Sequence, residues 1–179
     1  MNSELLEKLK YPIGKFEWNT TYSSADLKQA LLKIKNLPVQ LEELVKPLPL
    51  AVLSRRYRPE GWTIAQVVHH LADSHMHSYL RFKHALLEEN PTIKNYEEVK
   101  WASLPDASSL EIDYSLHLLK ALHQRWVLFL ENLSPEDFKR SYIHSERNKS
   151  YPLDTTLMIY AWHGEHHMHH IKNAIKQGY

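Results

Sequence analysis

The sequence contains no cysteine, few glycines and no long apolar run. Without cysteine the chain has no disulfide framework, no thiolate metal ligand and no cysteine nucleophile. Four glycines in all leave no glycine-rich phosphate loop. No stretch reaches the roughly 18 apolar residues of a membrane span, and none has the pattern of a signal peptide. These absences predict a cytoplasmic protein.

The sequence also lacks an excess of positive or negative charge. The formal net charge is +1, from 22 basic and 21 acidic residues, and no long basic block occurs. We therefore expect neither nucleic acid nor a membrane surface as a partner. With 179 residues, 43% of them hydrophobic, and no repeat or linker, the chain is expected to form a single domain over residues 1–179.

Four long segments have the apolar spacing of amphipathic helices. They run from Ser23 or Ser24 to about Lys46, from Thr63 to about Glu89, from Ser108 to about Glu131, and from Asp154 or Thr155 to Gly178. Thr63 with Gln66, and Ser108 with Glu111, have the spacing of a capping box. Pro38 predicts a kink or a break just before it. The pattern predicts an all-α protein built as a four-helix bundle.

Shorter segments connect these helices. Residues 1–20 are expected to form an extended arm held by aromatic and apolar side chains, and residues 47–62 a loop. The segment "LSPEDF" predicts a helical turn, with Ser134 as its cap. The segment "SYIHSERNKSYPL" predicts a possible short hairpin before the last helix.

Histidine is the unusual component of the composition. Ten of the 13 histidines lie in two windows, residues 69–84 and 163–170. Because successive helical residues turn by about 100°, four histidines of the second window share one arc of the last helix. They are His163, His166, His167 and His170. His169 and Glu165 point away from this arc, where we expect solvent.

This arc contains two pairs with i, i+4 spacing, His163/His167 and His166/His170, which is the spacing that a chelated divalent metal requires. Neutral imidazoles suit zinc, nickel, copper or iron. A third ligand would come from His69, His70, His75 or His77, among which spacing alone does not choose. The alternative is a hydrogen-bonded histidine network that only supports the core.

Two long motifs carry a resemblance to a known family. They are "GWTIAQVVHHLADSHMHSYLRFK" (61–83) and "YAWHGEHHMHHI" (160–171), with shorter matches in "YPIG", "YRPEGWT", "LHQRW" and "FKRSYIH". Together they resemble the YfiT-like branch of the DinB superfamily over nearly the whole chain. The resemblance implies a DinB-like four-helix bundle with one divalent metal per chain, zinc or nickel, held by three histidines. Carried onto this sequence, the ligands are His70, His166 and His170.

The same resemblance implies an enzyme acting on a small molecule, either a metal-dependent hydrolase or a transferase using a low-molecular-weight thiol such as bacillithiol. A three-histidine metal with an open position permits both reactions. Relatives with assigned reactions favour the transferase slightly, and the family also implies a homodimer. The competing hypothesis is a non-catalytic bundle whose metal or histidine network is structural or binds a ligand.

Three further groups have two interpretations each. Arg81, Lys83 and Arg125 are candidates for recognising an anionic group, although surface charges are the simpler interpretation. Asp73 would either orient a ligand imidazole or be solvated. The third group, which we expect in the core rather than in a substrate platform, consists of Trp62, Trp126 and Trp162.

Overall fold

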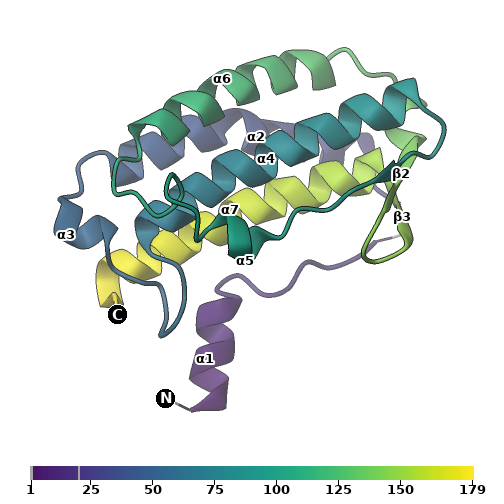
Figure 1. Ribbon diagram of the computed structural model, residues 1–179. Coiled ribbons are helices and arrows are strands. Elements are labelled where there is room, and N and C mark those ends of the chain that lie inside the picture. The colour runs from purple at the N-terminus through teal and green to yellow at the C-terminus, as the bar shows by residue number, and fades with distance from the viewer. Residues whose placement is uncertain (1, 20) are drawn as a thin grey trace.

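The computed structural model describes residues 2–19 and 21–179. The described chain is mostly helical, with a small three-stranded sheet at one end (Figure 1). Its elements are α1 (Ser3–Lys10), α2 (Ser24–Val45), α3 (Leu50–Leu53), α4 (Ile64–Leu87), β1 (Thr92–Ile93), α5 (Glu98–Trp101), α6 (Asp113–Leu130), the 3-10 turn η1 (Asp137–Lys139), β2 (Ser141–His144), β3 (Lys149–Pro152) and α7 (Leu153–Gln177). Within the described residues no helix is long and apolar enough to cross a membrane.

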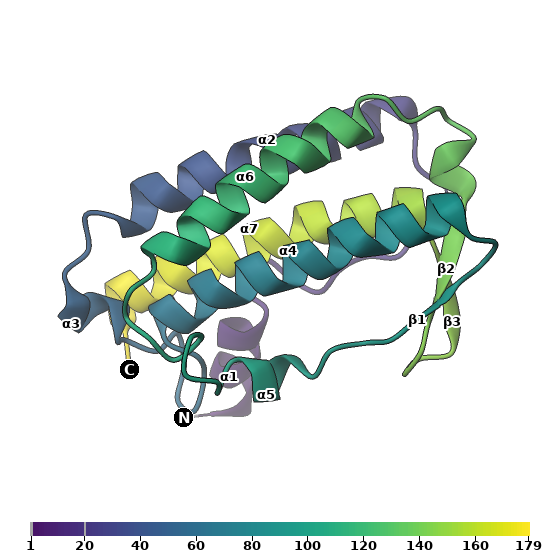
Figure 2. The same cartoon turned by 45° about the horizontal axis from the view of Figure 1, so that its top comes forward.

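The four long helices α2, α4, α6 and α7 form the bundle. Helices α2 and α6 lie on one side, and α4 and α7 lie on the other (Figure 2). Extensive contacts join α2 to α7 and α6, and α4 to α6 and α7. The order around the bundle is therefore α2–α6–α4–α7, which places α2 and α4 at opposite corners. The predicted four-helix bundle is confirmed.

The small sheet closes one end of the bundle. Strand β2 pairs antiparallel with β3, with Tyr142 opposite Tyr151, and Asn148 takes the positive φ of 47° that the connecting turn requires. This is the predicted hairpin. Strand β1, which the sequence did not predict, adds in parallel to β2 with Thr92 opposite Ile143.

Two apolar clusters fill the interior. The cluster nearer α3 includes Leu41, Leu71 and Ile171, and the cluster nearer the sheet includes Phe82 and Trp126. Trp126 is fully buried, which confirms its expected place in the core. Such close packing fixes the rotation of α4 and α7 about their axes, and this rotation decides which histidines face each other.

Several expected boundaries were wrong. The N-terminal arm begins with α1, which Asn2 caps by accepting from the Leu5 N–H at 2.8 Å, and the expected loop 47–62 contains α3. Helix α6 begins at Asp113 rather than at Ser108, because the Glu111 N–H is bound by Ser109 Oγ at 3.0 Å in a local turn. Helix α7 begins one residue early, at Leu153.

Helix starts with a complete reciprocal cap were predicted more accurately. Thr63 and Gln66 form the predicted capping box at the start of α4, and Ser23 forms one with Asp26 at the start of α2. Helix α2 continues through Pro38 without a break. The carbonyl that Pro38 leaves without its helical donor has another partner, described below.

Candidate metal centre

Five buried or partly buried histidines of α4 and α7 form two overlapping groups. One ligand nitrogen from each of His70, His163 and His167 lies within 4.8 Å of the other two, and the same holds for His166, His167 and His170. The predicted ligands are thus divided, since His70 belongs to the first group while His166 and His170 belong to the second. The set His70/His166/His170 stays a prediction, and the ring nitrogens indicate which group is free to bind an ion.

A chain of three histidines leads from the backbone of α2 to His163. Because Pro38 has no N–H, the carbonyl of Ile34 lacks its helical donor, and His123 Nδ1 lies 2.6 Å from this oxygen. A carbonyl only accepts, so His123 Nδ1 carries the proton and its Nε2 is an acceptor. His75 Nδ1 donates to that Nε2 at 2.9 Å. His163 Nδ1 in turn donates to His75 Nε2 at 3.2 Å.

These hydrogen bonds determine which nitrogen of His163 carries the proton, because a neutral imidazole has one N–H and one nitrogen with a free lone pair. With its proton on Nδ1, His163 presents a bare Nε2. That atom lies 3.2 Å from Nε2 of His70, across the space between α7 and α4. The hydrogen-bond chain therefore leaves His163 with a lone pair that points toward the other members of the first histidine group.

A second chain leads from the C-terminal end of α1 to His167. The carbonyl of Lys10, at the end of that helix, accepts from His170 Nε2 at 3.1 Å. His170 Nδ1 is then an acceptor, and His167 Nδ1 donates to it at 3.3 Å. His167 is left with a bare Nε2. Because both nitrogens of His170 are used, this ring supports a ligand better than it serves as one.

His70 completes the first group with less constraint. Its Nδ1 lies 3.5 Å from the hydroxyl of Tyr96, a long contact that does not fix the tautomer. Its ring packs 4.6 Å from Trp62 and 5.2 Å from His163, measured between centroids. Moving its proton to Nδ1, toward Tyr96, would turn a third lone pair toward the bare Nε2 of His163.

Burial keeps these rings neutral, as metal ligation requires. Burial, with a smaller contribution from His166, lowers the pKa of His70 to about 3. Burial likewise lowers the pKa of His163 and of His167 well below the usual range, and neighbouring histidines add to the effect. At neutral pH each of these imidazoles has a lone pair.

The other histidines of the two motifs lie outside the first group. His69 donates from Nε2 to the Ser109 carbonyl at 3.1 Å and accepts from Ser115 Oγ at 2.7 Å. His77 stacks on Tyr96 with 4.2 Å between centroids. His166 stacks on Trp162 at 4.5 Å, and its buried Nδ1 has no hydrogen-bond partner among the described residues.

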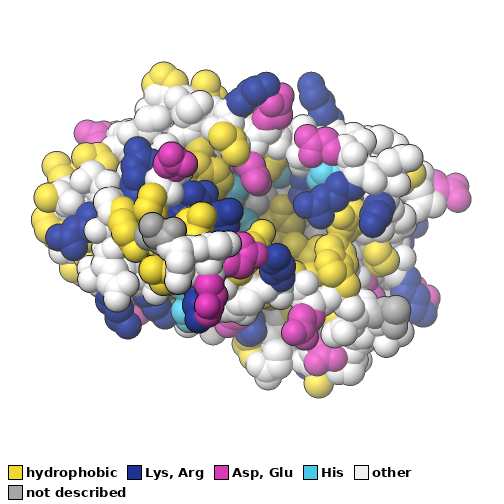
Figure 3. Space-filling view, turned by 90° about the horizontal axis from the view of Figure 1, so that it is seen from below, with side chains coloured by type: hydrophobic (Ala, Val, Ile, Leu, Met, Phe, Trp, Pro, Cys, Tyr) yellow, Lys and Arg dark blue, Asp and Glu magenta, His cyan; other side chains and the backbone are white. Residues whose placement is uncertain are grey.

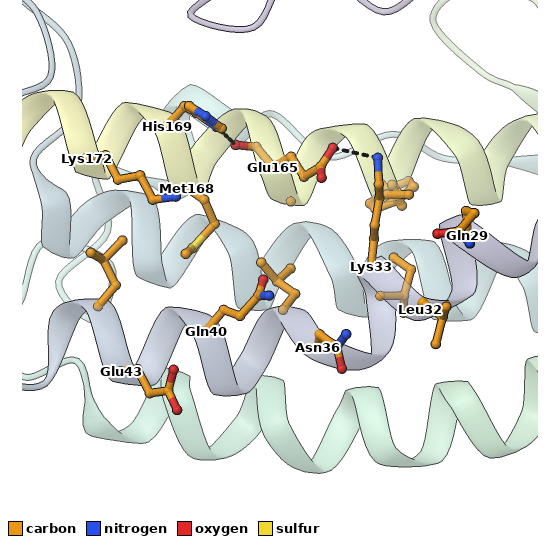
Figure 4. A pocket seen from close by; sticks show the side chains of 16 residues that line it. Gln29, Leu32, Lys33, Asn36, Gln40, Glu43, Glu165, Met168, His169 and Lys172 are labelled. Atoms are coloured by element: carbon orange, nitrogen blue, oxygen red, sulfur yellow. Dashed lines mark hydrogen bonds and ion pairs between the residues drawn. The ribbon is translucent and has the colours of Figure 1, made fainter. Parts of the chain in front are cut away.

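His169 lies on the opposite side of α7, as predicted. Its Nδ1 donates to the Glu165 carbonyl at 2.9 Å, and the Glu165 carboxylate pairs with Lys33 at 2.8 Å (Figure 4). Both residues line a groove of about 730 Å³ between α2 and α7, and none of the clustered histidines lines this groove. The clustered histidines therefore lie on another face of α7.

The clustered histidines line a cavity of about 520 Å³ beside α1 and α5. On this face of the molecule the surface is hollowed, with histidine side chains visible in the hollow and both basic and acidic side chains around it (Figure 3). Trp62 and Trp162 line the cavity and contact His70 and His166 respectively, and Trp62 also packs against the apolar cluster nearer α3. The core role expected for these two residues stays a prediction. A small molecule entering the cavity would meet both indoles and the histidines.

The two remaining groups have different outcomes. Asp73 makes no hydrogen bond to a histidine among the described residues, and burial, with Asp106 nearby, raises its pKa to about 6. Arg81 is buried, which excludes the surface interpretation for this residue, whereas Arg125 is exposed and Lys83 lies over the Phe129 ring at 4.2 Å.

The predicted family is confirmed by comparison with known proteins. The chain belongs to the DinB superfamily, whose model matches residues 34–171. A Bacillus mycoides protein named "Putative metal-dependent hydrolase" is 45% identical over 93% of this chain and 95% of its own. A Bacillus cereus protein of the same name is 44% identical over 96% of this chain and 98% of its own.

Solved structures agree on the fold. YfiT from Bacillus subtilis, described as a probable metal-dependent hydrolase with an unusual four-helix bundle topology, matches with a TM-score of 0.92 and 38% identity, over 95% of this chain and 97% of that chain. The mycothiol-dependent maleylpyruvate isomerase matches at 18% identity with a TM-score of 0.50, over 81% of this chain and 59% of that chain. At that identity the likeness concerns the fold alone.

Proposed function

We propose that the protein is a metal-dependent hydrolase whose divalent ion, zinc or nickel, is held by Nε2 of His70, His163 and His167. The observation that carries this proposal is the convergence of three imidazoles, two of which have Nδ1 engaged through hydrogen-bond chains that begin at backbone carbonyls. The names of the relatives support the metal dependence and the reaction class.

The donor set fits such an ion. It offers three neutral imidazoles with no thiolate, and a three-histidine set is typical of catalytic rather than structural zinc sites. The bound ion would supply Lewis acidity to a water molecule or a thiol at its remaining position. His75 and His170 would orient the ligand rings, and the two indoles of the cavity would limit the access of bulk water.

Hydrolysis predicts turnover without a thiol. Untagged protein would be stripped with a chelator, reloaded with zinc or nickel, and assayed against a panel of aryl esters and amides. We expect activity that depends on the metal, needs no thiol and disappears in His163→Gln. If the reloaded protein turns over only electrophiles, and only with an added low-molecular-weight thiol, the transferase replaces the hydrolase while the ligand set stands.

A non-catalytic metal site would give a third result. The ion would bind with one equivalent per chain and raise the unfolding temperature, with no turnover in either assay. His117, which is exposed on α6, provides the matched control, since His117→Gln should leave both metal content and activity unchanged.

A further inference from the structure

A second cavity adjoins the proposed metal centre. Its volume is about 530 Å³, and it lies between α4, α5, the sheet and α7. His163 lines both this cavity and the one around the clustered histidines, and so do Glu98 and Val99 of α5. A molecule in this second cavity would therefore lie next to a proposed metal ligand.

Arg81 lies in the wall of this cavity with only 7% of its surface exposed. Its Nη1 donates to the Tyr160 hydroxyl at 2.8 Å and its Nη2 to Asn95 Oδ1 at 3.2 Å. A guanidinium has five N–H donors, so three remain for another partner. Among the described residues, no ion pair includes Arg81.

This arrangement is costly for the protein alone. An arginine stays charged at any physiological pH, and burying a charge without a counter-ion strongly destabilises the folded protein. Two neutral acceptors and the Tyr142 ring, whose centroid lies 5.8 Å from the guanidinium carbon, compensate for it only in part. An anionic ligand would supply the missing charge.

The acidic side chains of the cavity have other partners. Glu97 pairs with Lys100, and Glu146 accepts from Asn95 Nδ2 at 2.9 Å. Burial raises the pKa of Glu98, although Arg147 opposes this. None of these carboxylates neutralises Arg81 directly.

Tyr160 connects Arg81 to the proposed metal centre. Its hydroxyl accepts from Arg81, and its ring lies 5.5 Å from the ring of His163, between centroids. An anion on Arg81 would thus be held about one side chain away from His163. Arginine is the residue best suited to bind a carboxylate or phosphate through two parallel hydrogen bonds.

We propose that this cavity binds the anionic group of the substrate on Arg81, so that the substrate is a small carboxylate or phosphate whose reacting bond extends toward His163. The proposal deepens the metal-dependent activity proposed above and names the class of substrate. It does not require the metal for binding at Arg81, and this permits a separate test.

The test uses metal-free protein and three probes of similar size: phenylacetate, its neutral isostere phenylacetamide, and phenyl phosphate. Calorimetry gives their affinities, and the Nε–H NMR signal of Arg81 reports the place of binding. Because hydrogen bonds to charged groups contribute about 1.5–3 kcal/mol, an anion should bind about 10- to 100-fold more tightly than phenylacetamide. Whichever anion binds more tightly distinguishes a carboxylate from a phosphate substrate.

Two variants of Arg81 and one control complete the design. Arg81→Gln should abolish the preference for the anion, and Arg81→Lys should keep it in weaker form, because lysine retains the charge but not the fork. Arg125→Gln, at an exposed arginine of α6, should change nothing. If Arg81→Gln does not fold, wild type and Arg81→Lys still decide the question.

Binding of both phenylacetate and phenyl phosphate by the wild type that is no tighter than binding of phenylacetamide would overturn the proposal. An anion preference that survives in folded Arg81→Gln would overturn it as well. Either result would leave the metal content and the assays of the proposed hydrolase unaffected. Conversely, a protein that binds no metal but prefers anions through Arg81 would refute the hydrolase alone.

Discussion

His123 Nδ1 lies 2.6 Å from the carbonyl oxygen of Ile34, which is the carbonyl that Pro38 deprives of its helical hydrogen bond. A proline inside a helix usually costs about 3 kcal/mol, partly through this lost bond. Here the freed acceptor fixes the tautomer of His123 and, through His75, that of His163. A helix defect in α2 thus contributes to the orientation of a proposed ligand on α7.

Disrupting this hydrogen-bond chain should weaken metal binding without changing any of the proposed metal ligands. His123→Asn places an amide donor near the position of Nδ1, so the bond to Ile34 can persist, but it removes the acceptor for His75. Loss of such an outer partner typically costs 10- to 100-fold in metal affinity, which competition with a chelator measures. His117→Asn, on the exposed face of α6, is the control. Unchanged affinity in His123→Asn would show that the chain is incidental.

Pro38→Ala tests the origin of the same chain. Alanine restores an N–H that competes with His123 for the Ile34 carbonyl and also favours the helix. We expect metal affinity to fall while the free energy of unfolding of the metal-free protein stays equal or rises. A lower metal affinity without a lower free energy of unfolding would show that the variant disturbs the orientation of His163 rather than the fold as a whole. A parallel fall of both quantities would instead indicate that Pro38 matters only for packing.

The pH dependence of stability should include a contribution from His123. Burial lowers the pKa of this ring to about 4, although its bond to Ile34 opposes the shift, while the unfolded value is near 6.5. Between these values the unfolded state binds the extra proton, so stability falls as the pH falls from 6.5 toward 4. One such group contributes up to about 1.4 kcal/mol per pH unit.

Urea unfolding of the metal-free protein from pH 4.5 to 8 measures this slope. In His123→Asn the slope below pH 6.5 should be smaller than in the wild type by up to that amount, about 1.4 kcal/mol per pH unit. Above pH 7 the slopes should coincide. Identical slopes at all pH values would mean that His123 does not titrate as its burial requires.

The homodimer implied by the family resemblance stays a prediction. Trp18 of the N-terminal arm is 58% exposed, and its ring contacts Phe16 at 5.1 Å and Tyr151 at 5.7 Å between centroids. We expect sedimentation equilibrium at micromolar concentration to give the mass of two chains. Trp18→Ser should shift this equilibrium toward the monomer. A wild-type protein that sediments as a monomer at that concentration would rule the dimer out.

The bundle could be predicted from the sequence because amphipathic spacing and the Thr63/Gln66 cap are local signals. The start of α6 could not, since Ile112 at its N-cap makes no side-chain hydrogen bond. Helix α1 was not predicted although Asn2 provides a local cap for it. The order of helices around the bundle also depends on tertiary packing. Local patterns therefore gave the elements more reliably than their arrangement.

The metal ligands, too, could not be chosen from local sequence patterns. His163/His167 and His166/His170 have identical spacing on one arc of α7, so no periodicity separates them. What separates them is the second nitrogen of each ring. The hydrogen-bond chains that engage Nδ1 of His163 and of His167 end at the carbonyls of Ile34 and Lys10, far away in the sequence. No spacing rule indicates that His123, one of two histidines on α6, belongs to the same network.

The most direct test of the account is the metal content of untagged single variants, measured by mass spectrometry after reloading with one equivalent of zinc. The decisive pair is His163→Gln and His166→Gln, which lie one turn apart on α7 and differ only in which histidine they remove. The account predicts that His163→Gln loses most of the metal, while His166→Gln and the outward-facing His169→Gln keep close to one ion per chain. Full occupancy in His163→Gln together with loss in His166→Gln would contradict it and restore His70, His166 and His170 as the ligands.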